Sequence, residues 1–230
     1  MSRVARFIFS IAALLVIAGA SASVRADTIT IVGAGSGQFS TATVVCDFNS
    51  QTNTLTFTIT NTSAITQPGS TSTITGIGFD LPPLGNITSP STGLNGFTGT
   101  HTAVVGPSDF DFSDGALGNV PANFNNVVLD FGFTTGPSGN FAGGSVEDGL
   151  LPGESATFTV SGTAFSNFTE ELICNAIFVR FQEVPLAGNS GGSDVGVPGN
   201  PIPEPSSILL LGSALVGLGG YARKKFKTRN

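Results

Sequence analysis

Hydrophobic and polar residues alternate one by one along several short stretches in the middle of the chain. Leu55, Phe57 and Ile59 alternate with four threonines, and Phe158 and Val160 alternate with two threonines and a serine. A period of two places one set of side chains on each face of a strand, so these stretches predict strands with one buried face. The predicted strands cover residues 28–32, 39–48, 54–61, 73–81, 100–105, 126–133, 155–161 and 175–181.

Residues that favour turns separate these predicted strands. The chain holds 31 Gly and 13 Pro, and the run Leu151-Pro152-Gly153-Glu154 reads as a turn that enters one strand. Only residues 168–173 show a helical period, and it is weak. Regular short strands with Gly and Pro turns predict an all-β fold, a single β-sandwich domain over residues 27–185.

The amino-terminal end has the layout of a signal peptide. Residues 1–6 are basic, and residues 7–19 form an apolar stretch that is too short to span a bilayer comfortably. Small residues follow, and both 20–22 and 24–26 fit the pattern that signal peptidase cleaves. We expect a signal helix within residues 1–26, with cleavage after Ala26, and a buried amino-terminal helix is the alternative.

The carboxy-terminal end consists of four consecutive parts. Residues 186–202 are rich in Gly, Pro, Ser and Asn and predict a linker. The tripeptide Pro203-Glu204-Pro205 follows, and residues 206–222 then predict a transmembrane helix about 25 Å long. The last part is a basic cluster that the positive-inside bias places in the cytoplasm. Its members are Arg223, Lys224, Lys225, Lys227 and Arg229.

The order tripeptide, short spanning helix and basic cluster resembles the PEP-CTERM sorting signal. The match covers about residues 203–229 of a tail that spans residues 203–230. The resemblance implies that Pro203, Glu204 and Pro205 are recognised by an exosortase, which releases the protein near the motif. It also implies a Gram-negative-type bacterium that makes exopolysaccharide and biofilm. The body is similar, more loosely, to the small β-sandwich proteins that often carry this signal. A plain membrane anchor is the alternative.

Charge is distributed very unevenly along the chain. All basic residues except Arg180 lie in the two ends, whereas all 15 acidic residues lie between Asp27 and Glu204. The segment from Asp27 to Glu204 therefore carries 15 negative charges against one positive, a net of −14. Such a surface repels phosphates and anionic lipids, which excludes nucleic acid as a partner. An anionic polysaccharide would need bridging cations to bind it.

Cys46 and Cys174 are the only cysteines. In an exported chain an even pair predicts one disulfide, for which the chain-entropy model gives about 4–5 kcal/mol. Two buried free thiols are the alternative. A metal site on both cysteines is disfavoured because the chain has one His to complete it.

Acidic residues recur at short intervals between 109 and 115. Oxygen-rich loops of this spacing can hold calcium, so Asp109, Asp111 and Asp114 form a candidate site for weak Ca²⁺ binding. The sixth position holds Asp114 where an EF-hand needs Gly, and a solvated turn is the alternative. The sequence predicts no other cofactor.

Three further motifs suggest catalysis or nucleotide binding but lack essential parts. The run 33–37 has its third Gly one residue early for a dinucleotide fingerprint, and a predicted strand follows it. The run 188–192 places Ser190 in a serine-protease-like context, preceded by His101 and Asp109, but within the predicted linker. The adjacent acids at 147–148 and 170–171 form no obvious glycosidase dyad. We therefore expect no enzymatic activity.

Together these features predict an exported structural protein of the cell surface or extracellular matrix, associated with exopolysaccharide or biofilm. It would be held in the inner membrane until an exosortase sorts it through the tail. A glycan- or calcium-binding β-sandwich module is the first alternative. An extracellular hydrolase, based on the scattered carboxylates, is the weaker one.

Overall fold

The computed structural model describes residues 27–64, 71–82, 94–118, 120, 127–136, 140–141, 144–186 and 189–199. The predicted signal peptide, the tripeptide 203–205, the spanning helix and the basic cluster lie outside these residues. Within the described part, no helix has the length and apolar character needed to cross a membrane.

Ten antiparallel strands form one continuous sheet in the order β5-β8-β3-β2-β1-β10-β9-β4-β7-β6. Their bounds are β1 Asp27–Gly33, β2 Gly37–Asn49, β3 Thr54–Asn61, β4 Thr73–Phe79, β5 Phe97–Val105, β6 Asp111–Leu117, β7 Leu129–Thr134, β8 Ser155–Gly162, β9 Ile177–Leu186 and β10 Asn189–Pro198. Two short helices, η2 at Thr163–Asn167 and α2 at Glu170–Cys174, join β8 to β9.

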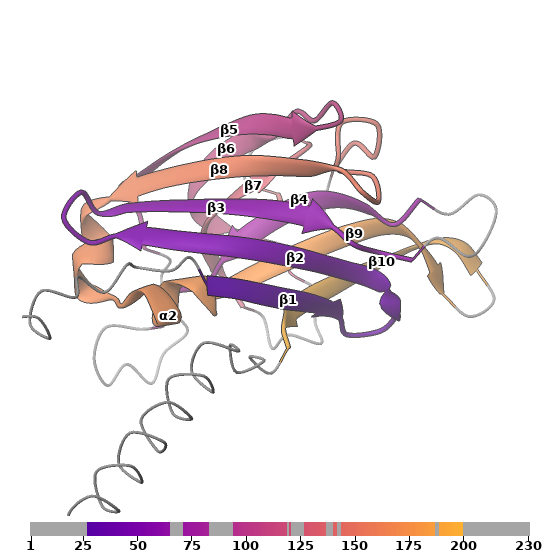
Figure 1. Ribbon diagram of the computed structural model, residues 1–230, viewed down its shortest axis with the longest axis horizontal. Helices are drawn as coiled ribbons and strands as arrows, with labels where there is room; N and C mark the ends of the chain where they lie inside the picture. Colours follow the sequence, from indigo (N-terminus) through magenta and orange to yellow (C-terminus); the bar gives the residue numbers. More distant parts are fainter. Residues whose placement is uncertain are drawn as a thin grey trace, which may run out of the picture.

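The sheet folds over on itself until its two edge strands, β5 and β6, approach each other (Figure 1). A Cβ added to Gly99 of β5 would meet the ring of Phe112 of β6, which shows how close the edges are. Across the interior, the ring of Phe57 on β3 lies 5.2 Å from that of Phe79 on β4. The all-β prediction is confirmed. The sandwich-like layers, however, belong to one nearly closed sheet.

Alternation along β3 fixes its register against both neighbours. Phe57 lies opposite Cys46 of β2 and Phe158 of β8, and all three side chains are buried. On the outer face, the hydroxyls of Thr58 and Thr157 are 2.7 Å apart. A slip of one residue would turn the apolar set to solvent and the threonines into the core, so the pattern specifies this pairing strongly.

Phenylalanine supplies most of the largest fully buried side chains of the core. The chain has 19 Phe and no Trp, so large rings fill the interior without a polar atom that needs a partner. Phe57 and Phe158 stack at 5.1 Å, and Phe79 and Phe131 stack at 4.8 Å. The rings therefore form a connected cluster that joins the two layers.

Two strands lie where the sequence predicted none. β6 covers most of the acidic run, and β10 occupies Asn189–Pro198, within the segment predicted to be a linker. β10 is a strand because β1 and β9 pair with it on both sides. Gly196 fits there because any Cβ would lie 2.6 Å from Ile31 Cγ2. Backbone pairing and close packing, which composition does not reveal, decide the structure of this segment.

Candidate functional site

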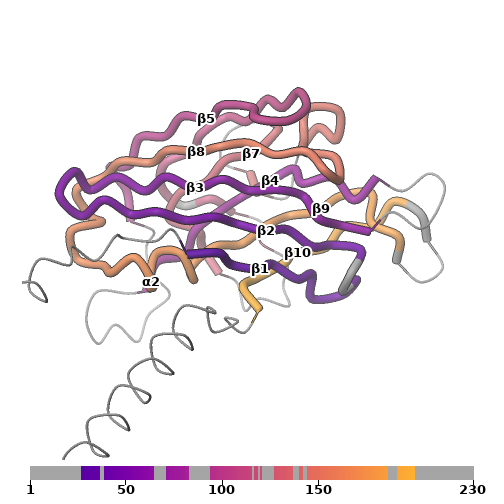
Figure 2. The backbone as a smooth tube through the Cα atoms, in the orientation of Figure 1, coloured from indigo at the N-terminus to yellow at the C-terminus, as the bar shows by residue number. Residues whose placement is uncertain are grey.

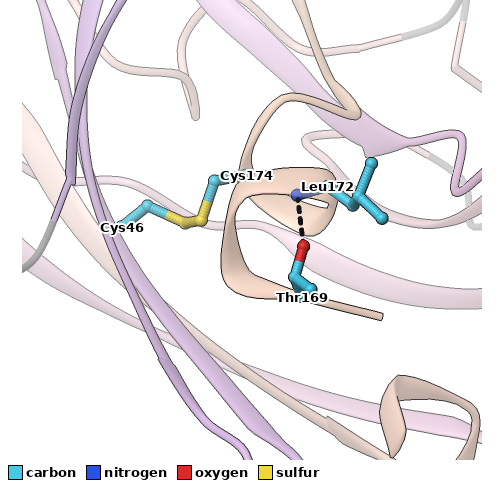
Figure 3. The surroundings of a disulfide bond; sticks show 4 residues. All are labelled: Cys46, Thr169, Leu172 and Cys174. Atoms are coloured by element: carbon cyan, nitrogen blue, oxygen red, sulfur yellow. Dashed lines mark hydrogen bonds between the residues drawn. A yellow bond between two sulfur atoms is a disulfide. The ribbon is translucent and has the colours of Figure 1, made fainter. Parts of the chain in front are cut away.

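Cys46 and Cys174 lie at disulfide distance, with Cα atoms 6.2 Å apart (Figure 3). Cys46 belongs to β2, and Cys174 is the last residue of α2. The side chain of Thr169 accepts a hydrogen bond from the Leu172 amide at 3.4 Å and so begins this helix. The geometry agrees with the predicted pairing and would tie the small helical segment to the sheet.

The acidic run 109–114 does not form a calcium loop in the structure. Asp111 and Asp114 belong to β6, and residues three apart in a strand point to opposite faces. The carboxylate of Asp114 accepts hydrogen bonds from the amides of Gly96 at 2.9 Å and Phe97 at 3.1 Å. In the part of the chain that is described, no three His, Cys, Asp or Glu residues form a group able to hold a metal ion.

The glycine-rich turn between β1 and β2 holds an internal carboxylate. Asp194 of β10 is 7% exposed and accepts hydrogen bonds from the amides of Gly35 at 3.1 Å, Ser36 at 2.8 Å and Val195 at 2.8 Å. The Ser36 hydroxyl also donates to it. Successive amides of such a turn form an anion-binding concavity. Here the chain's own aspartate fills it, which explains the partial resemblance to a phosphate-binding loop.

His101 and Ser190 are kept apart by the sheet. His101 lies on β5 and Ser190 on β10, and four strands separate them in either direction around the sheet. The ring of His101 lies 5.9 Å from that of Phe158, and its Nε2 is 3.2 Å from the carbonyl oxygen of Ser108. The structure therefore assembles no protease triad from His101, Asp109 and Ser190.

The adjacent acids have separate local roles. Glu170 and Glu171 occupy the first turn of α2, where negative charge favours the helix. Burial, with repulsion from the Asp27 and Asp47 carboxylates, raises the pKa of Glu170. Glu147 is exposed in the loop before β8. Neither pair places two carboxyl groups across a described cavity in the manner of a glycosidase.

A pair of aspartates, of which Asp130 is buried and Asp80 half-buried, lies next to α2 and was missed by sequence reasoning. Asp130 is 1% exposed and accepts hydrogen bonds from the amides of Leu81 at 2.7 Å and Leu94 at 2.5 Å. Burial raises its pKa. Burial, with repulsion from Asp130, raises the pKa of Asp80 to about 6. Asp80 also lines a shallow cavity of about 270 Å³ beside Glu171 of α2.

A second cavity, of about 340 Å³, contains the sole basic residue of the body. Arg180 lies on β9, opposite Gly76 of β4 and Val195 of β10. Its side chain is 7% exposed, and its Nε atom is buried without a hydrogen-bond partner among the described residues. The sequence shows Arg180 as an isolated base in an acidic body. It does not show the cavity, because the lining residues come together only when β9 pairs with β10.

The carboxy-terminal end carries a PEP-CTERM protein-sorting motif, matched over residues 201–225. The match includes the tripeptide Pro203-Glu204-Pro205 and the first three residues of the basic cluster. Such a motif implies export, membrane-associated sorting and processing by an exosortase. Searches of curated proteins and of solved structures found no significant match to the chain.

Proposed function

We propose that this chain is a structural protein of the cell surface or extracellular matrix, associated with exopolysaccharide or biofilm. An exosortase sorts it through its carboxy-terminal tail. The observation that carries the proposal is the PEP-CTERM motif at residues 201–225, which directly follows the folded body. Signal peptidase removes residues 1–26, and the tail holds the body at the outer side of the inner membrane until processing.

The junction between the body and the motif supports a release mechanism. The amide of Gly199 donates to the carbonyl of Thr30 at 2.9 Å, so the ordered sheet extends to that residue. Three residues separate Gly199 from Pro203, so their Cα atoms can be at most about 14 Å apart. The acidic body is therefore held near anionic lipid headgroups, which repel it. Cleavage of the tail removes the restraint, and repulsion favours departure from the membrane.

A role without catalysis is supported by what the carboxylates do. Asp114, Asp130 and Asp194 each accept hydrogen bonds from backbone amides of loops or strand ends. These three acids thus stabilise the architecture and are not directed at a substrate. Incubating the released protein with exopolysaccharide or peptide should liberate no new chain ends, and turnover would contradict this part of the proposal.

Processing in a host with an exosortase tests the sorting role directly. The full chain and a triple variant, Pro203→Ala, Glu204→Ala and Pro205→Ala, would be expressed in parallel and fractionated. Intact mass should show a wild-type product that begins near Asp27, ends near the motif and lies outside the inner membrane. The triple variant should keep its tail and remain in the inner membrane.

A matched control keeps this comparison specific. Glu147→Ala removes a carboxylate from an exposed loop of the body and should be processed like the wild type. A wild-type chain that keeps its tail through Asn230 in the inner membrane would show that the tail is a plain anchor. Processing of the triple variant as efficient as that of the wild type would show that the tripeptide is not part of the recognition element.

A further inference from the structure

Arg180 is an unusual residue to find buried in this protein. The folded body, residues 27–199, holds 14 acids and one base, yet burial lowers the pKa of that base and no carboxylate offsets the effect. A buried, unpaired guanidinium destabilises the folded state, because it loses hydration without gaining an ionic partner. With so many acids available, the absence of a partner among the described residues points to one supplied from outside the chain.

Arg180 lines a cavity of the body. On β9 the side chains of Ile177, Val179 and Phe181 are buried in the main core, whereas Arg180 alternates with them onto the outer face. Opposite Arg180, Gly76 of β4 has no side chain, and a Cβ there would lie 3.3 Å from the ring of Phe141 and 3.4 Å from Arg180 Cβ. The cavity of about 340 Å³ falls in the usual size range of small-molecule sites.

The remaining walls of the cavity are mostly polar. Gln182 and Ser193, which are paired in the β9–β10 register, contribute an amide and a hydroxyl. Gly191 and Gly192 expose backbone, and Glu183 contributes a carboxylate that already accepts a hydrogen bond from Thr71 Oγ1 at 2.8 Å. Val146 is the apolar member of the lining. Such a surface offers hydrogen-bond donors and acceptors to a ligand that carries many hydroxyls.

Charge restricts the ligand further. A planar guanidinium matches a carboxylate in geometry and charge. The carboxylate of Glu183 and the net charge of −13 on residues 27–199 disfavour phosphates and polyanions. A ligand with one negative charge and several hydroxyls meets both conditions. We propose that the cavity at Arg180 binds a sugar acid, with its carboxylate on the guanidinium and its hydroxyls on Gln182 and Ser193.

Calorimetry on the exported chain tests this site with glucuronate as the probe. Glucose has the same ring without the carboxylate, and acetate has the carboxylate without the ring. We expect saturable binding of one glucuronate per chain, with glucose and acetate each at least about tenfold weaker. Equal affinity for glucose would overturn the role of Arg180, and equal affinity for acetate would overturn recognition of a saccharide.

Variants identify the residue responsible. Arg180→Met removes the charge at similar length, and Arg180→Lys keeps the charge but loses the planar fork, so both should weaken glucuronate binding at least about tenfold. Gln182→Glu adds a repelling carboxylate and gives a second test should Arg180→Met fail to fold. Thr102→Ala, on exposed β5, is the control and should bind normally. Absence of binding to the wild type, or wild-type affinity in folded variants of Arg180 and Gln182, would overturn the proposal. Processing of the tail is a separate readout, so the two proposals fail independently.

Discussion

Replacing Asp194 by Ala should strongly destabilise the fold, because this one carboxylate joins both ends of the body. It lies on β10, the last strand, and accepts hydrogen bonds from three backbone amides. Two of the donors, Gly35 and Ser36, belong to the turn after β1. The substitution leaves these amides without their acceptor in a largely buried site. Each amide that stays unsatisfied costs about 1–3 kcal/mol.

Water has partial access to the turn and can satisfy some of these amides, which reduces their summed cost. We therefore expect Asp194→Ala to lower the free energy of unfolding by about 3–5 kcal/mol. Asp194→Asn keeps one acceptor oxygen and should cost less. Urea unfolding, followed by far-ultraviolet circular dichroism, measures the midpoint and the slope. The matched control is Asp111→Ala, an exposed aspartate on β6, which should change stability by less than about 0.5 kcal/mol.

Ser36→Ala makes the test specific to the turn. The Ser36 hydroxyl donates to Asp194, so its removal should cost less in the Asp194→Ala background than in the wild type. Additive effects would show that the two residues act independently. An Asp194→Ala variant that is no less stable than Asp111→Ala would refute the claim that the turn is held by an internal anion.

Three other predictions concern stability. Replacing Cys46 and Cys174 by Ser should lower the free energy of unfolding by up to about 5 kcal/mol, since the bridge would span 128 residues; a reductant should shift the urea midpoint of the wild type but not of the variant. The raised pKa of Asp80, about 6 against 3.8, means that the folded state holds its proton more tightly than the unfolded chain. Stability should therefore fall as pH rises from 3.8 to about 6, and Asp80→Asn should flatten this slope and be more stable than the wild type at pH 8. The raised pKa of Asp130 adds a slope of the same sign, which the variant keeps. A slope of stability against pH that is the same in Asp80→Asn and in the wild type, measured by urea unfolding, would contradict the assignment to Asp80. Finally, Arg180→Met should raise the free energy of unfolding by about 1 kcal/mol or more, because it removes a buried unpaired charge; a lower urea midpoint would show that the guanidinium stabilises the fold.

The strands that are most readable from the sequence are those in which alternating apolar and polar side chains determine which face is buried. In β3 and β8, large apolar residues alternate with threonine, and no other register buries them. β10 escaped prediction because its glycines and polar residues carry no such pattern. Its place depends on Ile31 and Phe181 of the neighbouring strands, which a Cβ at Gly196 would contact.

The candidate sites divide in the same way. The sorting motif was readable because its parts follow one another in the chain, and residues 201–225 match it. Asp194 and Gly35 are 159 residues apart, so their contact was invisible in the sequence. The acids of residues 109–114 have the spacing of a loop in the sequence, whereas in the fold Asp111 and Asp114 belong to β6. This strand forms by pairing with β7, where Asp111 lies opposite Thr134.

The adjacency of β1 and β10 has a consequence for the order of events during secretion. Ile31 lies opposite Pro198, so the first and last strands of the body are neighbours near the middle of the sheet (Figure 2). A chain that crosses a membrane from its amino terminus delivers β1 first and β10 last. The sheet cannot close until the final strand has emerged, and such distant pairings form slowly. The incomplete intermediate exposes an unpaired edge of β1, to which a second chain could add. A tail that delays departure from the membrane would give each body time to close before it meets its neighbours.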